Sequence, residues 1–244
     1  MTSTTLDVQA TSESLKAPAV SAHHSSPLTA WLSEFEVKIA ADFRRRTKLD
    51  YKETVHQIIE AAEPAPGMHV LDAATGTGVI ARQFVGRVGE HGHIIGVDNA
   101  ARIEQARLAA LSAKVSRKLE WREATPEKLP FELASFDLVT CAMAFHRLPA
   151  AEFLASAYRV LKPGGRLIIA DELAPVAPSP LRAFLRHSYY RFIVRDTVEA
   201  DARFYQAEEL AGLLRAAGFR QQTIRVLRER SKHDWAFALV KAVK

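Results

Sequence analysis

Short apolar runs alternate with stretches of helical periodicity along most of this chain. Residues 94–98 and 166–171 are brief apolar runs, as in parallel strands that are buried on both faces. Residues 27–46 instead place apolar side chains three or four positions apart, as one face of a helix does. The alternation predicts an α/β protein. Helices are expected over residues 27–46, 51–62, 79–85, 100–114, 151–161, 181–194 and 206–217, and strands over a run ending at 71 and over 94–98, 118–122, 135–141, 166–171, 222–229 and 235–243.

The two ends of the chain differ in character. Residues 1–26 are rich in Ser, Thr and Ala and have no hydrophobic periodicity, so we expect a disordered leader. It contains His23 and His24, but two histidines in a flexible tail do not predict a metal site, and no other metal site is expected. Residues 27–244 fit a single domain of ordinary size.

A glycine loop follows the first predicted strand. Val70-Leu71 lead into Asp72, and Gly76 and Gly78 then precede a helix start at Val79. Glycines let the backbone turn sharply and approach a ligand closely, because they carry no Cβ. The free N–H groups of the loop and the positive helix end suit an anionic ligand group.

Two acids near this loop predict the kind of ligand. Asp98 ends the second predicted strand, twenty positions after Gly78, where a carboxylate can accept hydrogen bonds from both ribose hydroxyls. Residues 76–81 also fit the dinucleotide pattern G-x-G-x-x-G/A, which alone is a weak signal. Asp72, however, stands between strand and glycines, where it would repel a pyrophosphate and attract an ammonium or sulfonium. An adenosine-containing cofactor with a positive charge is therefore favoured.

At this point the chain resembles the class I S-adenosylmethionine-dependent methyltransferases, especially the ubiquinone/menaquinone-biosynthesis (UbiE-like) type. Residues 70–78 are similar to the first motif of that family, V-L-D-x-A/G-x-G-T-G. Further similar stretches are S-F-D-x-V at 135–139, R-V-L-K-P-G-G at 159–165 and A-G-F at 217–219. Residues 123–131 align with E-G-D-A-E-x-L-P-F, with Ala124, Thr125 and Pro126 replacing Gly, Asp and Ala. The resemblance covers roughly residues 66–243.

The resemblance implies a fold and a division of the chain. We expect a doubly wound, Rossmann-like sheet of seven strands, mostly parallel with an antiparallel last strand, and helices on both faces. Residues 27–63 would form cap helices over the cleft, and residues 174–205 would form a lid insertion over the substrate. A helix end at the 162–165 turn is expected because Pro cannot continue a helix and Gly-Gly permits the reversal into the next strand.

The resemblance also implies a set of residues that bind S-adenosyl-L-methionine. Asp72 would bind the methionyl ammonium directly or through water, and Asp98 the ribose. Thr125 would accept from the adenine amino group more weakly than the family's aspartate, since a hydroxyl is a weaker acceptor than a carboxylate. The implied cofactor-binding residues are Asp72, Ala74, Thr75, Gly76, Thr77, Gly78, Asp98, Asn99, Thr125, Pro126 and Cys141.

His146 is the candidate catalytic residue. It follows the fourth predicted strand, near where the methyl group should point, so it is a candidate general base; a structural role in orienting its loop is an equal alternative. Secondary candidates from the lid are His187, Tyr189 and Tyr190.

The implied function is methylation of a small organic molecule on oxygen or carbon, in secondary-metabolite or quinone biosynthesis. The chain has Cys141-Ala142-Met143-Ala144 where many amino-methylating nucleic-acid enzymes have Asn-Pro-Pro-Tyr. Three alternatives stay open: a cofactor-binding protein that catalyses a cyclisation or rearrangement without methylating, a nicotinamide oxidoreductase and an RNA methyltransferase.

Composition narrows the partners. The net charge is +5 and the pI is about 9.4, yet the basic residues are scattered apart from the stretches 44–48 and 225–232. Solvated faces explain this better than a nucleic-acid patch, so no nucleic-acid partner is expected. The single cysteine and the lack of a membrane-spanning run favour a cytoplasmic enzyme without a membrane partner. The oligomeric state, including a homodimer, is left open.

Overall fold

A computed structural model describes residues 27–115, 118–177, 179–195, 197–228 and 235–244, with the backbone alone for residues 27–35 and Arg182. The predicted disordered leader, with His23 and His24, lies outside the described residues. Within the described ranges, no helix is long and apolar enough to cross a bilayer.

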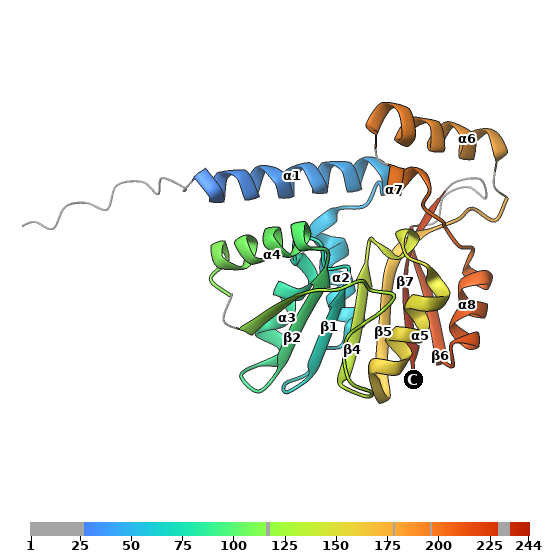
Figure 1. Ribbon diagram of the computed structural model, residues 1–244. Helices are drawn as coiled ribbons and strands as arrows, with labels where there is room; N and C mark the ends of the chain where they lie inside the picture. Colours follow the sequence, from blue (N-terminus) through green and yellow to red (C-terminus); the bar gives the residue numbers. More distant parts are fainter. Residues whose placement is uncertain (1–26, 116–117, 178, 196, 229–234) are drawn as a thin grey trace, which may run out of the picture.

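The core of the protein is a sheet of seven strands in the order β3-β2-β1-β4-β5-β7-β6 (Figure 1). Strands β1 to β5 run parallel, and β7 pairs antiparallel with both β5 and β6, as the resemblance predicts. The chain therefore has the expected doubly wound sheet. Its strands are β1 (His69–Ala73), β2 (His93–Asp98), β3 (Leu119–Glu123), β4 (Phe136–Ala142), β5 (Leu161–Leu173), β6 (Arg220–Arg228) and β7 (Ala236–Val243).

Helices cover both faces of the sheet because strand residues alternate in direction. Val70, Ile94 and Leu138 pack in one apolar cluster with α2 (Tyr51–Ala62), α3 (Val79–Val88) and α4 (Ala100–Ser112). The next residues along the same strands, such as Leu71 and Val139, pack in a second cluster with α5 (Ala150–Val160) and α8 (Ala207–Ala216). The expected helices on both faces are confirmed.

The remaining helices lie beyond the carboxyl ends of the strands. Figure 1 shows α1 (Pro27–Thr47) across this edge and α6 (Pro180–Ser188) outside α1. A π-helix, η3 (Tyr189–Val194), continues α6, and α7 (Thr197–Ala200) follows. The strand order reverses between β1 and β4, and ligands of open α/β sheets bind at such a switch point. These helices therefore cover the edge where a ligand is expected.

One predicted boundary was wrong. The turn expected at 162–165 is an irregular part of β5, which begins at Leu161 by pairing with Phe136. The register shifts before the next pair, Leu138 with Arg166. Gly164 has φ 77° and donates its N–H to the carbonyl of Lys244, so the carboxyl end of the chain holds the irregular stretch in the sheet.

Candidate active site

The glycine loop is tightly wound between β1 and α3. Ala74, Gly76 and Gly78 have φ values of 53°, 56° and 73°, in the left-handed region. Thr75 N–H donates to the Val97 carbonyl, at 3.0 Å, so the loop is also fixed to β2. The backbone thus reverses direction within five residues, and α3 begins without a side-chain cap at Gly78. Its first-turn N–H groups form a positive end beside the loop.

The two glycines have different reasons to lack a side chain. A Cβ on Gly76 would meet no atom within 4 Å, so this residue borders open space. A Cβ on Gly78 would lie 2.3 Å from Cη2 of Trp121, whose ring also fills the place of a side chain on Gly96. Gly76 therefore leaves room for a ligand, whereas Gly78 leaves room for the indole of Trp121.

Asp98 faces this loop from the end of β2. One of its carboxylate oxygens accepts from Gly76 N–H and the other from Asn99 N–H, both at 2.8 Å. Each oxygen has a further lone pair, so the half-buried carboxylate can still accept from two ribose hydroxyls. The side chain of Asn99, which was expected beside the adenine, accepts from Arg102 N–H at 3.1 Å and caps α4.

Asp72 lies beneath the loop and is only 2% exposed. Its carboxylate accepts from the hydroxyls of Thr75 and Thr140, at 2.5 and 2.6 Å, and from Ala81 N–H in the first turn of α3. Burial raises the pKa of Asp72 to about 6, although these three donors oppose the rise. The structure thus shows Asp72 joining β1, the loop, α3 and β4, and shows no contact that tests the expected ammonium binding.

The other expected cofactor residues occupy varied surroundings. Thr75 and Thr77 are buried in the loop, and Thr125 is exposed beside half-buried Pro126 in the turn after β3. An open hollow of about 760 Å³ lies next to that turn, between residues 123–130 and α5, and not in front of the glycine loop. Cys141 is fully buried in the apolar cluster under α5 and α8, and burial raises the pKa of its thiol. Its side chain belongs to the core.

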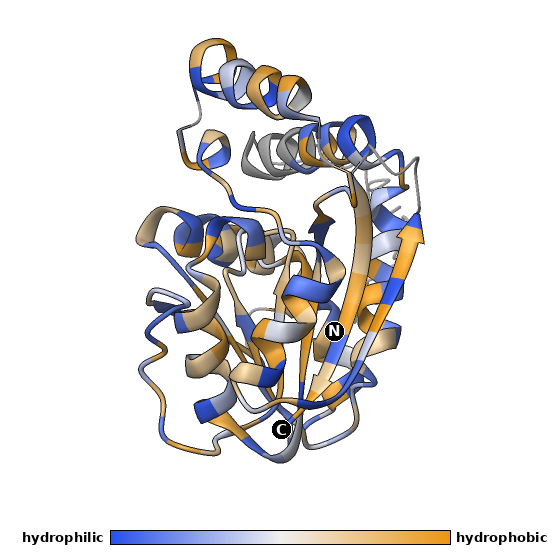
Figure 2. Cartoon of the chain, turned by 90° about the vertical axis from the view of Figure 1, so that its right-hand side faces the viewer, coloured by the Kyte–Doolittle hydropathy of each residue, from blue (hydrophilic) through white to orange (hydrophobic). Residues whose placement is uncertain are grey.

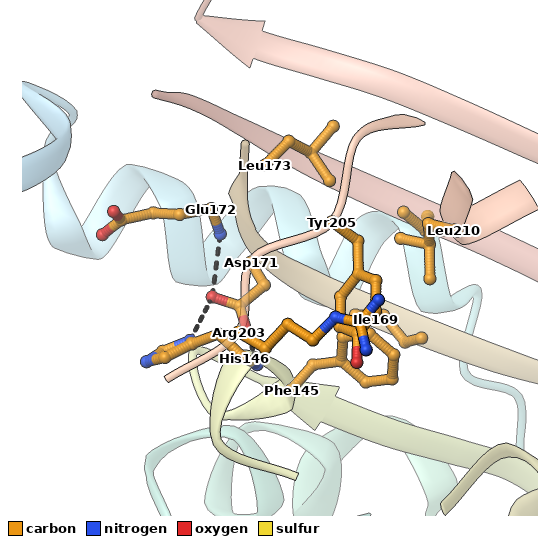
Figure 3. A pocket seen from close by; sticks show the side chains of 10 residues that line it. Phe145, His146, Ile169, Asp171, Glu172, Leu173, Arg203, Tyr205 and Leu210 are labelled. Carbon is orange, nitrogen blue, oxygen red and sulfur yellow. Dashed lines mark hydrogen bonds and ion pairs between the residues drawn. The ribbon is translucent and has the colours of Figure 1, made fainter. Parts of the chain in front are cut away.

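His146 is held on both sides by carboxylates. It lies in η2 (Phe145–Arg147), just after β4, and is 2% exposed. Its Nδ1 is 2.8 Å from the carboxylate of Asp171 (Figure 3). Its Nε2 is 3.2 Å from the carboxylate of Glu199. The ring stacks on Phe204, with centroids 4.9 Å apart and an angle of 8°. Asp171 also accepts from His146 N–H, so the whole residue is fixed against the end of β5.

These contacts set the charge of the imidazole. Burial alone would lower the pKa of His146, but the charge of Asp171 and hydrogen bonds to Asp171 and Glu199 raise it to about 9. At neutral pH the ring is a cation whose two N–H groups are both donated. In this arrangement it has no free nitrogen to accept a proton, which argues against the general-base interpretation and favours the positioning alternative.

Glu199 joins four cations from three elements. It lies 2.9 Å from Arg46 at the end of α1, 2.7 Å from Arg147 of η2 and 2.6 Å from Arg186 of α6, in addition to His146. The hydrogen bond from His146 and the neighbouring arginines hold the pKa of Glu199 well below its usual range, against the effect of burial. We call Arg46, His146, Arg147, Asp171, Arg186 and Glu199 the charged cluster.

Glu172 borders the charged cluster. Its Oε1 is 3.4 Å from Nε of Arg46, and neither atom makes a hydrogen bond within the described part of the chain. A cavity of about 10 Å³, room for roughly one water, lies on the other side of Asp171 among Phe145, Tyr205 and Leu210. Figure 3 shows the side chain of Glu172 pointing away from this cavity.

The secondary candidates lie at the rim of the same region. Nδ1 of His187 is 3.1 Å from the Ala200 carbonyl, so it ties α6 to α7. The ring of Tyr190 lies under the guanidinium of Arg186, at 4.8 Å from its centroid, and Tyr189 is 43% exposed. None of the three contacts His146 through a hydrogen bond among the described residues.

Sequence reasoning missed most of the charged cluster, although one signal was available. Asp171 and Glu172 lie in the carboxyl-terminal part of β5, as Asp72 and Asp98 do in β1 and β2, and acids at carboxyl strand ends meet at one edge of a parallel sheet. Glu199 had no such signal, because a short helix in the lid brings it there.

Comparison with known proteins identifies the family of this chain. Residues 70–165 match the family described as "Methyltransferase domain". The chain is 35% identical over 182 residues to the ubiquinone/menaquinone biosynthesis C-methyltransferase UbiE of Rhizobium leguminosarum bv. trifolii, covering 68% of this chain and 70% of that protein. This chain belongs to the UbiE family of S-adenosylmethionine-dependent methyltransferases. Across the first such relatives, the chain spans about two thirds of their length.

Solved structures share the fold at lower identity. The YcgJ protein of Bacillus subtilis superposes with a TM-score of 0.62 at 20% identity, covering 80% of this chain and 99% of that one. The [4+2]-cyclase SpnF superposes with a TM-score of 0.63 at 18% identity, covering 79% and 80%. These likenesses show the fold alone and carry no argument about the reaction.

The residues at the glycine loop fit S-adenosyl-L-methionine, the cofactor of the family. Gly76 borders open space, Asp98 retains acceptors for a diol, and the start of α3 presents N–H groups. The neutral hydroxyl and amide donors around Asp72 and Asp98 leave the negative charge of both acids uncompensated by any described cation within ion-pair distance. A ligand carrying a sulfonium and an ammonium suits such a site.

Proposed function

We propose that the protein transfers the methyl group of S-adenosylmethionine to a carbon or oxygen of a small, hydroxylated aromatic molecule of the quinol type. Open space at Gly76 beside the carboxylate of Asp98 carries the proposal, since ligands of open α/β sheets bind at such a switch point. The relatives are named as C-methyltransferases of ubiquinone and menaquinone biosynthesis, which favours a carbon of a quinol precursor.

Positioning supplies most of the proposed catalysis. The cofactor, when bound, supplies an electrophilic methyl group on a sulfonium. Asp98 would hold the ribose and the loop at Ala74, Thr75 and Gly76 would hold the methionyl part. Alignment of two reactants in a closed cleft is worth several orders of magnitude in rate. An acceptor that enters as a phenolate needs no base for the transfer, and water can take the proton that a ring carbon releases afterwards.

We propose that His146 is a positioning residue. The imidazolium joins the end of β5, through Asp171, to the lid, through Glu199. Residues 27–63 and 174–205 would then act as cap and lid over the acceptor, held by Arg46 from α1 and Arg186 from α6.

Labelled cofactor tests the function. The protein is incubated with methyl-labelled S-adenosylmethionine and a panel of quinol precursors, catechols and simple phenols, and product label is counted. Transfer to a ring carbon or hydroxyl supports the proposal. Product that forms without label supports the cyclisation alternative, and preferential binding of NAD supports an oxidoreductase.

We further propose a cytoplasmic location and no nucleic-acid partner. Within the basic stretch 44–48, Arg45 pairs with Asp42, and Arg46 pairs with Glu199 inside the protein. The stretch therefore presents fewer free cations than its sequence suggests. Salt-dependent, tight binding of RNA would contradict this proposal. The mass of the particle in solution decides whether the protein is a homodimer.

A further inference from the structure

Helix α6 and the π-helix η3 present apolar side chains to solvent. We define their outer face as the five residues that are between 56% and 72% exposed. These are Leu181, Phe184, Leu185, Phe192 and Ile193. Figure 1 shows α6 as the outermost element above α1, and Figure 2 shows apolar positions along this outlying helix.

The polar side of the same helices points inward. The side chain of Arg186 is 17% exposed, reaches Glu199 and stacks on Tyr190 and Phe204. His187 lies against the Ala200 carbonyl. This arrangement reverses the usual one, in which a surface helix turns its apolar stripe toward the core. The sequence places residues 181–194 in a lid insertion, and in the structure Phe184 and Phe192 of this segment are exposed.

A contiguous exposed apolar face on a folded protein usually marks a surface that binds something. Charge indicates what this face binds. Residues 180–195 contain four arginines and no acid. Arg191 and Arg195 are exposed, and Arg191 is 3.9 Å from Asp201, at the outer limit of an ion pair. Apolar residues flanked by arginines are typical of helices that lie in the interface of an anionic bilayer.

We propose that the outer face of α6 and η3 seats the protein on an anionic lipid surface. Phe184, Phe192 and Ile193 would enter the boundary between headgroups and acyl chains, and Arg191 and Arg195 would contact lipid phosphates. A second copy of the chain fits this face less well. A symmetric dimer places one patch against itself, so the arginines of one copy would face those of the other. The sequence predicts no membrane partner because no run can span a bilayer. Binding to the surface of a bilayer does not need a spanning run.

The proposed lipid-binding face is connected to the charged cluster through Arg186. Arg186 lies on the inner side of α6, opposite Phe184, and binds Glu199 directly. The outer face is therefore linked to α7 and His146 through Arg186 and Glu199. The inference depends on the exposed side chains and not on the identity of the methyl acceptor.

Vesicle flotation tests the proposal. The full chain is mixed with vesicles of phosphatidylcholine alone or of phosphatidylcholine with phosphatidylglycerol. We expect binding to the anionic vesicles that weakens at high salt, because screening reduces the attraction of the arginines. The double variant F184S/F192S should bind at least about tenfold more weakly than the wild type, since two large apolar side chains no longer enter the interface. The variant Leu133→Ser is the matched control, because Leu133 is 68% exposed on the far side of the fold and its loss should leave binding unchanged.

Three outcomes would overturn the proposal. The first is no flotation with anionic vesicles, and the second is flotation that F184S/F192S does not reduce. The third is a dimer in sedimentation velocity that F184S/F192S dissociates, which would assign the face to a second copy. The thermal midpoint of F184S/F192S, expected to equal that of wild type, shows that the variant folds.

Discussion

The two sides of the carboxyl edge of the sheet hold their acids in different ways. At the ends of β1 and β2, Asp72 and Asp98 accept from hydroxyls and backbone N–H groups, and Gly76 is 22 positions from its partner Asp98. Beyond β4 and β5, Glu199 binds cations, one of which, Arg46, is 153 positions away. The first side is built from neutral donors and the second from ion pairs.

This difference indicates a division of labour. Neutral donors orient a carboxylate without pairing it with an opposite charge, so we expect this side to suit a cationic ligand. In the charged cluster both acids bind cations inside the protein, so neither carboxylate is left for a cationic ligand. We therefore infer that the β1–β2 side binds the cofactor and that the charged cluster holds α1 and the lid in place.

The largest expected effect comes from Glu199→Gln. The change keeps the shape of the side chain but leaves Arg46, Arg147, Arg186 and His146 without their shared anion. Loss of one partner of a buried ion pair costs about 3–5 kcal/mol. Thermal unfolding should shift down by roughly 10 °C, as measured by calorimetry. Glu60→Gln is the control, since the Arg87–Glu60 pair is exposed and should contribute less than about 1 kcal/mol. Equal shifts for both variants would contradict the division.

The next-largest expected effect is the contribution of His146 to the pH dependence of unfolding. Its pKa is about 9 in the folded protein, above the ordinary value near 6.5. Because this pKa is raised in the folded protein, His146 contributes its full stabilisation at pH values below the ordinary pKa. This stabilisation is lost as the pH rises through about 9. The loss is about 3 kcal/mol between neutral pH and pH 10. Urea unfolding at both pH values should show a smaller loss in His146→Gln, and an unchanged loss would contradict the cationic assignment.

The two glycines of the loop should respond differently to alanine. In Gly78→Ala the new Cβ meets Trp121 and the backbone is left-handed, so we expect a loss of about 2–4 kcal/mol. In Gly76→Ala only the backbone cost of about 1 kcal/mol applies. Denaturant titration measures both. Trp121→Leu should restore part of the stability of Gly78→Ala and none of that of Gly76→Ala; equal rescue would contradict the packing argument.

Asp98→Ala should weaken the binding of the cofactor product, S-adenosylhomocysteine. Two hydrogen bonds from ribose hydroxyls to a carboxylate are worth about 1.5–3 kcal/mol, or roughly 10- to 100-fold in affinity for S-adenosylhomocysteine. Titration calorimetry measures this. Asp137→Ala is the matched control, because that acid also accepts a backbone N–H but lies at the opposite edge of the sheet. Unchanged affinity in Asp98→Ala would contradict the proposed contact between Asp98 and the ribose.

The smallest expected effect is a gain. Thr125→Asp restores the carboxylate that the family has at this position and should bind the adenine amino group more strongly than a hydroxyl does. Affinity for S-adenosylhomocysteine should rise about threefold, a change of under 1 kcal/mol. Thr125→Ala should lose affinity by a similar factor. A gain in both variants would show that residue 125 does not face the adenine.

Local patterns were enough to predict the individual strands and the glycine loop. The apolar runs that predict strands end at Leu71 and Asp98, and the glycines stand at 76 and 78. These signals are local in sequence, and the geometry of the loop follows from backbone sterics. The role of Gly78 was not predictable in this way, because Trp121 reaches it from a different strand. The seven-stranded order, with its antiparallel last strand, came from the family resemblance.

The charged cluster could not be assembled from the sequence. Arg46 reads as a solvated helix end and Arg186 as part of an aromatic lid, and only tertiary contacts bring both to Glu199. His146 was predicted just after the fourth strand, and the structure places it there. Its chemistry depends on Asp171 and Glu199, which are 25 and 53 positions away, so its protonation could not be inferred from its own segment.

A crystal structure with S-adenosylhomocysteine bound tests the division most directly. The account predicts the ribose hydroxyls on the carboxylate of Asp98, the nucleoside in front of Gly76, and an intact contact between Glu199 and His146. A nucleoside seated in the hollow beside α5, or a ligand that replaces Glu199 among the arginines, would contradict it.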